Sequence, residues 1–598
     1  MTKWMVAAKK ADFKHIAEQY HISMILARLI RNRDITEETQ IKRYLYGNRD
    51  HLHDPHKMTD MDKAAAVLNE KILSGKQVRI IGDYDVDGIC STYILFSGIK
   101  FLGGAVSCEL PDRVHDGYGL NESLITNAIQ AGTDTILTCD NGIAATAEIA
   151  FAKKQGMTVV VTDHHEVPFD TDDAGNRNEI LPDADAIVDP KRAGEKYPFT
   201  EICGAVVAYK LIQVLLEKKT GTVLYTEEEK TKLLDELLEF AALATVCDVM
   251  ELKDENRIIV REGMKQMQQS GNLGLRALIH VNGLEEKKIN CYHLGFILGP
   301  CLNATGRLDS AMRALKLLMT KKSGEAAAIA GDLKALNDSR KEMTAKYVAQ
   351  AIAEVGKTSI IPKVLVIYLP ECHEAIAGIV AGRIREKYGR PTLILTDGED
   401  GVKGSARSIP AYDMYQELSA CSILFTKFGG HKMAAGLSMR KEDIGRLREK
   451  LNASCTLKEV DFQEVLHIDM EMPLLYANDK LVREVSLLEP FGNGNTRPIF
   501  AIRNIKLLSG KIMGKNQNCA KYKIMDENGM KYDMIYFGDM SRWTNFLIEK
   551  YGIETERKLN SGMYIELENA VEISLAYYPD INCYQGRESL QIVMTDFL

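Results

Sequence analysis

A chain of 598 residues with 45% hydrophobic and 26% charged residues is long enough for several globular domains. Its formal net charge of −8 gives no basic signature over the whole chain, so a polyanionic ligand has to be held by a local patch or by bound cations. The 12 cysteines form no CxxC pair, the N-terminus lacks the apolar core of a signal peptide, and no stretch approaches the ~18 consecutive apolar residues of a membrane span. We therefore expect reduced thiols, no membrane span and a cytoplasmic location.

The patterning along the chain predicts an α/β protein of several parts. Residues 1–75 carry helical spacing and predict a helical N-terminal segment. In residues 76–260, short β-rich runs alternate with helical segments, which predicts a parallel sheet with helices on both faces. Residues 261–355 predict a helical connector to a second α/β lobe at 356–455, and residues 456–598 show the short β-rich runs of a small barrel such as an OB-fold. We thus expect two α/β lobes joined by long helices, followed by an OB-like barrel.

The first chemically distinctive segment, residues 80–92, reads IIGDYDVDGICST. Asp85 and Asp87 follow a predicted strand two residues apart and can direct their carboxylates to one point, while Gly88 relaxes the backbone before the next helix. Taken alone, the segment is explained as well by a solvated acidic turn or by an aspartate that caps the helix.

Three later segments supply more ligands of the same kind. TILTCDNGI delivers Asp140, TVVVTDHHEVP delivers Asp163, His164 and His165, and LATVCDVMELKDENR delivers Asp248. In parallel sheets, ligands bind beyond the carboxyl ends of the strands, where these residues fall. Oxygen and nitrogen donors without ligand thiolates suit Mn²⁺ or Mg²⁺, and so many carboxylates favour two ions that promote displacement at phosphorus. The alternative is that the two histidines form a helix-capping or core pair.

The segments GDYDVDG, DNGI, TDHHE and TVCDVMELKDENR resemble the four motifs that define the DHH phosphoesterases. The resemblance covers nearly the whole chain and is strongest to the family's bacterial single-strand-specific 5′-to-3′ exonucleases. It continues through LNATGRLDSA, AGIVAGRIREKYGRPTLIL, GSARSIP, FGGHKMAAGLSM, LEPFGNGNTRPIF and INCYQGRESLQIVMTDF. It implies a DHH domain at 76–260, a DHHA1-type substrate-binding domain at 356–455 and an OB-like nucleic-acid-binding domain at 456–598.

The resemblance also implies metal ligands, with Asp140 as the bridge between two Mn²⁺ or Mg²⁺ ions: Asp85, Asp87, Asp140, His164 and Asp248. It places His165 near the scissile phosphate, either orienting the attacking water or donating a proton to the leaving 3′ oxygen, with Asp163 fixing a neighbouring imidazole. Many members of the family carry a histidine where this chain has Ile81. We therefore expect Asp83 or water to complete the shell of one ion.

Substrate contacts are implied for the second lobe and the connector. NATGR is expected to form a loop that presents Asn303 and Arg307, because a guanidinium can hold phosphate oxygens bidentately. GSARS and GGHKMAAG are expected to form an anion cradle that reads the 5′ phosphate, with Ser405, Arg407, Ser408, His431 and backbone N–H groups. The alternative for both glycine-rich segments is an ordinary tight turn.

In the barrel, alternating basic and aromatic residues are candidates for gripping single-stranded DNA: Lys521, Tyr522, Lys523, Tyr584 and Arg587. The competing explanation is that they form one buried and one solvated face of ordinary strands.

Three functions are compatible with these motifs. The favoured one is a metal-dependent exonuclease of single-stranded DNA that acts in repair and recombination, possesses a narrow single-strand cleft and functions as a monomer. A helicase and a single-strand-binding protein are candidate partners. The second is a phosphodiesterase for short oligonucleotides or cyclic dinucleotides, which leaves the N-terminal segment and the barrel unexplained. The third is a non-catalytic DNA-binding scaffold, which would be expected to have lost ligands that this chain retains.

Overall fold

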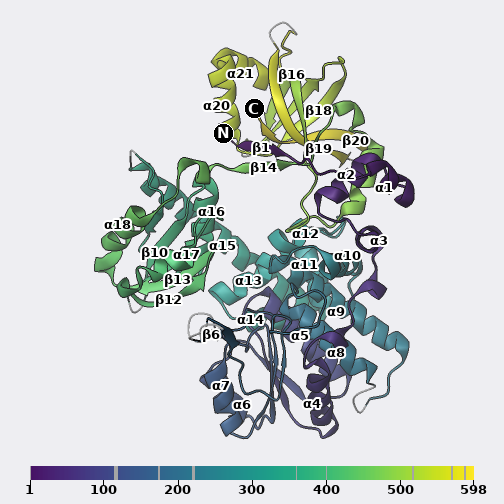
Figure 1. The fold of residues 1–598 in the computed structure, drawn as a ribbon, viewed down its shortest axis with the longest axis vertical. Coiled ribbons are helices and arrows are strands. Elements are labelled where there is room, and N and C mark those ends of the chain that lie inside the picture. Colours follow the sequence, from purple (N-terminus) through teal and green to yellow (C-terminus); the bar gives the residue numbers. More distant parts are fainter. Residues whose placement is uncertain are drawn as a thin grey trace. The chain divides into compact units, whose positions relative to one another are not determined.

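The computed structural model describes residues 2–112, 119–172, 175–218, 223–358, 360–398, 401–514, 517–566, 570–584 and 587–598. The chain divides into two compact units (Figure 1). The barrel unit comprises Met1–Gly47, Glu464–Phe491 and Asn495–Leu598, and the two-lobe unit comprises Asn48–Gln463 and Gly492–Gly494. The N-terminal segment predicted over residues 1–75 is therefore not one structural piece, because its first part belongs with the barrel and the rest with the lobes.

The first lobe of the two-lobe unit is built on a parallel sheet of order β3-β2-β4-β5-β8. Its strands are short apolar runs, and the central ones are buried on both faces, as is usual for parallel strands. The strands are β2 (Val78–Ile81), β3 (Val106–Glu109), β4 (Thr135–Cys139), β5 (Thr158–Thr162) and β8 (Ala186–Val188). All their carboxyl ends meet at one edge of the sheet.

Helices cover both faces of this sheet, as predicted. One face packs in a common core with α4 (Met61–Leu73), α5 (Val86–Phe101), α8 (Gly204–Glu217) and α9 (Glu227–Cys247). The opposite face packs with α6 (Glu122–Gln130) and α7 (Thr146–Lys154).

The connector is helical, as predicted. It contains α10 (Asp254–Met267), α11 (Leu273–Val281), α12 (Cys291–His293), a π-helical turn (Leu294–Leu298), α13 (Gly299–Leu308), α14 (Ala311–Met319) and α15 (Ser323–Gly356). The 34-residue helix α15 places Ala330 and Leu333 in the core of the first lobe and Ala351 and Val355 in that of the second. A single helix thus contributes to both hydrophobic cores.

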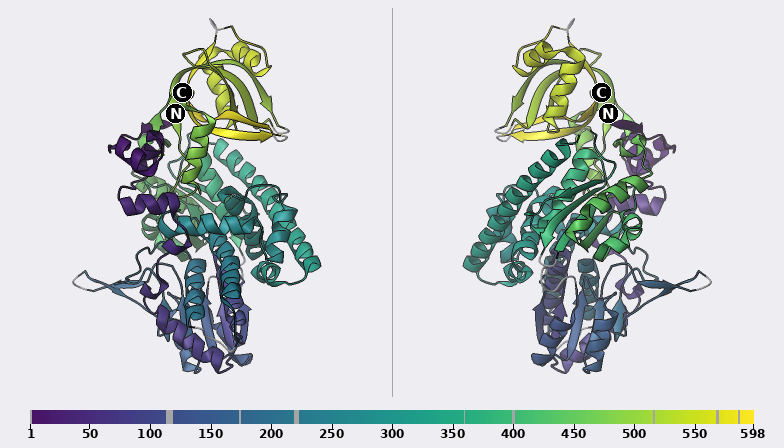
Figure 2. Two further views of the ribbon diagram at one scale, coloured as in Figure 1. Left: turned by 90° about the vertical axis from the view of Figure 1, so that its right-hand side faces the viewer. Right: turned by 90° about the vertical axis from the view of Figure 1, so that its left-hand side faces the viewer.

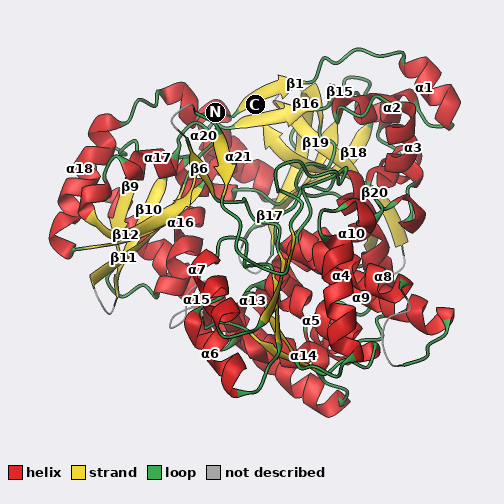
Figure 3. Ribbon diagram, turned by 60° about the horizontal axis from the view of Figure 1, so that its bottom comes forward, coloured by secondary structure: helices red, strands yellow, loops and turns green. Residues whose placement is uncertain are grey.

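The second lobe is a mixed sheet of order β12-β13-β11-β10-β9, in which only the β9–β10 pair is parallel. Its strands are β9 (Leu365–Tyr368), β10 (Thr392–Gly398), β11 (Gly401–Arg407), β12 (Phe425–His431) and β13 (Ala434–Met439). The C-terminal half of α15 and α16 (Glu374–Tyr388) pack on one side, and α17 (Met414–Ser419) and α18 (Ile444–Ser454) on the other. Figure 3 shows its strands between red helices.

The barrel unit contains a closed five-strand barrel, in which β16 pairs with both β17 and β19 (Figure 2). Its strands are β16 (Phe500–Met513), β17 (Cys519–Met525), β18 (Lys531–Tyr536), β19 (Val571–Tyr584) and β20 (Arg587–Phe597). Helices α1 (Phe13–Tyr20), α2 (Met24–Asn32) and α3 (Glu38–Tyr46) share its core with α20 (Met540–Tyr551) and α21 (Ile553–Asn560). The predicted fold class is confirmed. In the part of the chain that the structure describes, no helix is long and apolar enough to cross a membrane.

Candidate metal centre

The ends of neighbouring strands in the first lobe converge on one cluster of acidic and imidazole side chains. Asp83 and Asp85 follow β2, Asp140 follows β4, His164 and His165 follow β5, and Asp248 ends α9. Their ligand atoms form three overlapping groups, each within 4.8 Å: Asp83, Asp85 and Asp140; Asp87, His164 and Asp248; Asp140, His164 and His165. The structure therefore brings together all five predicted metal ligands, and it places Asp83, the open candidate to complete one shell, beside Asp85 and Asp140.

Asp85 has a structural role in addition to its place in the cluster. It is the N-cap of α5, and its Oδ1 accepts hydrogen bonds from the N–H groups of Asp87, at 2.9 Å, and Gly88, at 3.1 Å. Gly88 is required because a Cβ there would lie 2.4 Å from the carbonyl oxygen of Asp83. The capping explanation and the ligand explanation are thus compatible, since Asp85 keeps its second carboxylate oxygen for the cluster.

Asp87 is held by a helix that the motifs did not reveal. The first N–H groups of α8 donate to its carboxylate, Gly204 N to Oδ2 at 2.7 Å and Ala205 N to Oδ1 at 2.8 Å. A helix N-terminus favours a negative charge at this position. Gly204 also lies against Asp140, where a Cβ would approach the aspartate Cβ to 2.9 Å. The signal in the sequence was the glycine that opens the apolar helix after Cys203.

His164 lies among three carboxylates. Its Nε2 is 3.1 Å from Asp140 Oδ1, 3.4 Å from Asp87 Oδ2 and 3.8 Å from Asp248 Oδ2. Asp140 adopts a left-handed backbone with φ of 60°, which aspartate tolerates better than most residues. Asp140 belongs to two of the three groups, as expected of a bridging ligand.

Asp163 is satisfied by protein donors. Its Oδ1 lies 2.7 Å from Nδ1 of His165 and accepts from His164 N at 2.8 Å, while its Oδ2 accepts from Ile143 N at 2.9 Å. Burial opposes ionisation, but the His165 hydrogen bond and charge outweigh it, so the pKa of Asp163 lies below its usual range. His165 has a side chain that is 43% exposed. Burial lowers its pKa, but the bond to Asp163 and nearby carboxylates raise it to about 9.

For three other aspartates of the cluster, burial and neighbouring negative charge outweigh the compensation. Burial, with the charge of neighbouring aspartates, raises the pKa of Asp83 and that of Asp248 to about 8, and raises that of Asp140 well above its usual range. Among the described residues, Asp83 Oδ1 is buried and has no hydrogen-bond partner, whereas Ile81 is buried in the sheet. Hard oxygen and nitrogen donors with surplus negative charge fit divalent cations. Asp83 is therefore placed with Asp85 and Asp140 in the cluster, whereas Ile81 is not.

The predicted loop around NATGR is wrong, because Asn303 and Arg307 lie in α13, whose start is marked by the Gly299–Pro300 pair. Asn303 Oδ1 accepts from Val86 N at 3.2 Å, and Arg307 Nη1 donates to the carbonyl oxygen of Ala375 at 2.7 Å. The motif thus ties the start of α5 to the start of α16.

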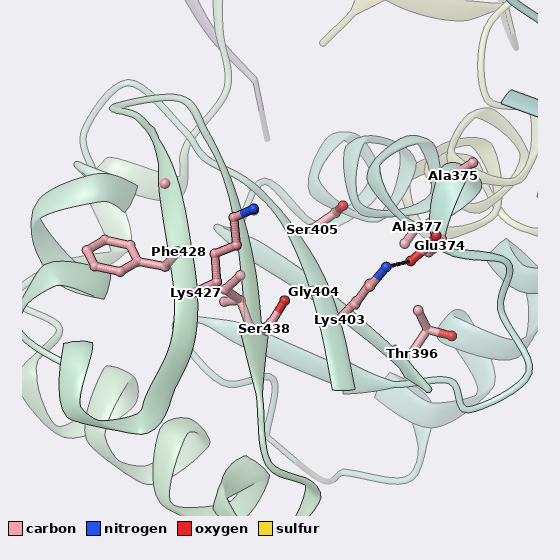
Figure 4. A pocket seen from close by; sticks show the side chains of 13 residues that line it. Glu374, Ala375, Ala377, Thr396, Lys403, Gly404, Ser405, Lys427, Phe428 and Ser438 are labelled. Atoms are coloured by element: carbon pink, nitrogen blue, oxygen red, sulfur yellow. Dashed lines mark ion pairs between the residues drawn. The ribbon is translucent and has the colours of Figure 1, made fainter. Parts of the chain in front are cut away.

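The glycine-rich segments of the second lobe are also not loops, since both lie mainly in strands of its sheet. The register of β11, β13 and β12 aligns three rows of residues on one face, which are Lys403–Ser438–Lys427, Ser405–Gly436–Gly429 and Arg407–Ala434–His431. The small residues of the middle row leave a pocket of about 410 Å³ (Figure 4). Lys403 Nζ lies 2.6 Å from Glu374 Oε2 at this pocket. Of the predicted contacts, Ser405 lines this pocket, and Arg407 and His431 lie in the neighbouring row on the same face of the sheet.

Two other predicted contacts are contradicted. Ser408 is fully buried and its Oγ donates to the carbonyl oxygen of Tyr412 at 2.6 Å, so its hydroxyl has a structural role. Tyr522 is buried in the barrel and donates to Asn560 Oδ1 at 2.6 Å. The neighbouring lysines, Lys521 and Lys523, both pair with Asp533. Arg587 is exposed at the start of β20, and the side chain of Tyr584 lies outside the described residues.

Family models match three consecutive regions of the chain. They are the DHH family N-terminal domain at residues 77–245, the DHHA1 domain at 362–456 and the RecJ OB domain at 468–596. The single-stranded-DNA-specific exonuclease RecJ of Salmonella typhimurium is 31% identical over 592 residues, covering 96% of this chain and 95% of that protein. The protein of the same name from Bacillus subtilis is 34% identical over 531 residues, which span 88% of this chain and 64% of the relative.

Solved structures agree on the fold. RecJ from Thermus thermophilus in complex with Mn²⁺ matches 100% of this chain and 79% of its own, with a TM-score of 0.78 at 24% identity. An exonuclease RecJ bound to manganese matches 68% of this chain and 97% of its own, with a TM-score of 0.57 at 30% identity. Fold, acidic cluster and matched domains define a protein of the DHH class with a second DHHA1 lobe and an OB barrel. Within that class, the chain belongs to the RecJ family.

Proposed function

We propose that this protein is a 5′-to-3′ exonuclease specific for single-stranded DNA, which hydrolyses phosphodiester bonds with two Mn²⁺ or Mg²⁺ ions and releases 5′-mononucleotides. The observation that carries the proposal is that Asp140 belongs to two overlapping groups of ligand atoms, one with Asp83 and Asp85 and the other with His164 and His165. The names of the relatives, single-stranded-DNA-specific exonucleases, support the choice of substrate.

Asp83, Asp85 and Asp140 would hold one ion, and Asp87, His164 and Asp248 would hold the other. Asp140 is the candidate for sharing, because its Oδ1 lies 3.1 Å from His164 Nε2 of the second group. When bound, such a pair of ions lowers the pKa of water and stabilises the charge that develops at phosphorus. The surplus charge of the cluster supports this assignment, because burial and the charge of neighbouring aspartates raise the pKa values of Asp83, Asp85 and Asp248 in spite of the donors and positive charges near them.

His165 acts at the scissile phosphate through Nε2. An ionised carboxylate only accepts hydrogen bonds, so Asp163 fixes the proton of His165 on Nδ1 and holds the ring with Nε2 on the opposite side. Asp163 is a positioning residue, since its oxygens already accept hydrogen bonds from Ile143 N and His164 N. The contact between Asp163 and His165 is compatible with both roles of His165, namely orienting the attacking water and donating a proton to the leaving oxygen.

The hollow on the second lobe takes the phosphates at the 5′ end. Ser405, Arg407 and His431 offer hydroxyl, guanidinium and imidazole donors on one face of the sheet, and Lys403 and Lys427 add positive charge. Arg407 lies against α16, where a Cβ on Gly378 would approach its Nη2 to 2.9 Å. Arg307 and Asn303 hold the helices on which this arrangement depends. Fixing a terminal phosphate gives the enzyme its direction.

The cellular setting follows from the substrate. We assign the protein to DNA repair and recombination in the cytoplasm, acting as a monomer on single strands exposed by a helicase or covered by a single-strand-binding protein. The matched RecJ OB domain supports a grip on the single strand beyond the reacting end.

The test is digestion of one single-stranded DNA, labelled in turn at its 5′ and 3′ ends, with Mn²⁺, with chelator and with the Asp140→Ala variant. Immediate release of 5′-labelled mononucleotide that requires metal and Asp140, with a blunt duplex left intact, is the expected result. Hydrolysis confined to oligonucleotides of two to five residues would replace the proposal with the short-substrate phosphodiesterase. Binding of DNA without any hydrolysis would favour the scaffold.

A further inference from the structure

Helix α9 ends abruptly at Asp248, and the turn after it is unusual. Val249 N donates to Val246 O at 3.2 Å and Met250 N donates to Thr245 O at 3.1 Å. Val249 has a φ of 58°. This is the common helix-terminating motif with a left-handed residue after the cap, a position that favours glycine. A β-branched residue is disfavoured there, so the turn needs support from elsewhere.

That support comes from Asn493, which is distant in sequence. Its Nδ2 donates to the carbonyl oxygen of Val249 at 2.7 Å, and its own carbonyl oxygen accepts from Leu252 N at 2.8 Å. Asn493 therefore holds the chain at two positions, the strained residue Val249 and Leu252. The residue Val249 is 65% exposed, so burial does not compensate for the strain.

The glycines on both sides of Asn493 allow this close approach. A Cβ on Gly492 would lie 2.7 Å from Leu252 Cδ1, and one on Gly494, which has a φ of 69°, would lie 2.8 Å from Glu251 Cβ. Gly492–Gly494 belongs to the two-lobe unit, although Phe491 and Asn495 belong to the barrel unit. The two glycines of the GNG sequence in LEPFGNGNTRPIF thus allow Asn493 to pack closely against the turn that follows Asp248.

We propose that Asn493 is a positioning residue of the metal centre. It fixes the turn at Val249 so that the carboxylate of Asp248 faces His164 and Asp87, where it completes one of the ligand groups. The inference rests on the proposed function in one respect, namely that the centre binds divalent cations. Asn493 itself is exposed, and its hydrogen bonds in the described part of the chain go to Val249 and Leu252, so it acts through the turn.

The test is the Asn493→Asp variant of the full chain, treated with chelator and titrated with Mn²⁺ by calorimetry and by the electron paramagnetic resonance signal of free Mn²⁺. Aspartate keeps the shape and the backbone of asparagine but replaces the amide donor with oxygens that repel the Val249 carbonyl. We expect Mn²⁺ affinity to fall ~10-fold or more, as is typical when a group that orients a ligand is lost. The melting temperature without metal measures any general loss of stability, which the control and the double variant below separate from the loss of Mn²⁺ affinity.

Two further variants separate positioning from general structure. Asn452→Asp is the matched control, since Asn452 Nδ2 also donates to a carbonyl oxygen, that of Val364, at 3.0 Å. It should leave Mn²⁺ affinity unchanged. In an Asp248→Asn background, Asn493→Asp should cause no further loss of Mn²⁺ binding, because the ligand through which it acts is already gone. Gly494→Ala, which displaces the same turn by a steric route, should reproduce the loss.

The outcomes distinguish this inference from the proposed function. Unchanged Mn²⁺ affinity in Asn493→Asp and Gly494→Ala would overturn the positioning role, as would an undiminished effect in the Asp248→Asn background. A wild-type chain that binds no Mn²⁺ would instead overturn the metal centre itself.

Discussion

Asp163 Oδ1 lies 2.7 Å from Nδ1 of His165. This contact gives Asp163 a different role from that of Asp140, the other aspartate near the two histidines. Asp163 accepts protein hydrogen bonds and belongs to none of the ligand groups, whereas Asp140, at the end of the next strand, belongs to two of them. Adjacent strand ends of one sheet therefore supply a positioning carboxylate and a ligand carboxylate.

The Asp163→Asn variant tests this separation. The amide can no longer accept in the same way from both His165 and the backbone, so the ring loses its fixed tautomer and orientation. We expect hydrolysis to fall ~10²-fold or more, in the range of a lost acid–base group, with Mn²⁺ affinity nearly unchanged. Steady-state rates and a Mn²⁺ titration check it. Loss of Mn²⁺ binding in parallel with activity would mean that Asp163 is a ligand. The double variant of Asp163→Asn and His165→Ala should hydrolyse DNA only slightly more slowly than either single variant.

Metal binding should stabilise the folded protein. Burial and mutual repulsion raise the pKa values of Asp83 and Asp248 to about 8, which shows that gathering these carboxylates without cations is costly. A ligand present at 100 times its dissociation constant stabilises the folded state by ~2.7 kcal/mol. We expect Mn²⁺ to raise the melting temperature of the wild type and to have a much smaller effect on Asp87→Asn. The exposed residue Asp479 provides the control variant, Asp479→Asn, which should respond like the wild type.

How far the sequence predicts this centre depends on what each residue contacts. The ends of β2, β4 and β5 could be located because short apolar runs define parallel strands, and the carboxyl ends of such strands share an edge. The contact of Asp87 with Gly204 N and Ala205 N could not be predicted, because it joins segments that no local sequence pattern connects. The support of Val249 by Asn493 escapes prediction for the same reason.

The wrong predictions have local causes. Alternation in a strand reveals two faces but not which one is buried, so the sequence leaves Tyr522 as either a DNA contact or a core residue, and the structure places it in the barrel core. Ser408 lies just beyond the β11 residues that share the polar face, and its backbone turns it inward. Glycine in NATGR suggested a loop, whereas Gly306 allows α13 to approach Tyr84, whose carbonyl oxygen would lie 2.5 Å from a Cβ.

Arg407 should affect substrate binding more than chemistry. It shares the polar face of β11 with Ser405, away from the acidic cluster in sequence and sheet. We expect Arg407→Ala to raise KM for 5′-phosphorylated DNA ~10-fold while kcat changes less, because a charged hydrogen bond to phosphate is lost. The matched control is Ser408→Ala, which should lower stability without changing KM. An equal KM for 5′-phosphorylated and 5′-hydroxyl DNA in the wild type would contradict the phosphate site.

Glu239 should make stability depend on pH. It is buried in α9, and burial raises its pKa from the usual 4.5 to about 7, although Ser270 donates a hydrogen bond to it. The folded state thus favours the protonated form, so its contribution to stability is complete below about pH 4.5 and is lost as the pH rises to about 7. At 1.36 kcal/mol per pKa unit, the change is ~3 kcal/mol. In thermal melts, the decrease in stability from pH 5 to pH 8 should be smaller for Glu239→Gln than for the wild type. An equal decrease in both proteins would contradict the role of Glu239.

The most direct test of the account is to count the bound ions and measure their coupling. Wild-type protein freed of metal and titrated with Mn²⁺ should bind two ions per chain, and its electron paramagnetic resonance spectrum should show the exchange coupling of two Mn²⁺ ions that share a carboxylate. Asp140→Ala should abolish the coupled spectrum and all hydrolysis of single-stranded DNA together. A wild-type chain that binds a single uncoupled Mn²⁺, or a coupled pair that survives in Asp140→Ala, would contradict the two-metal centre proposed here.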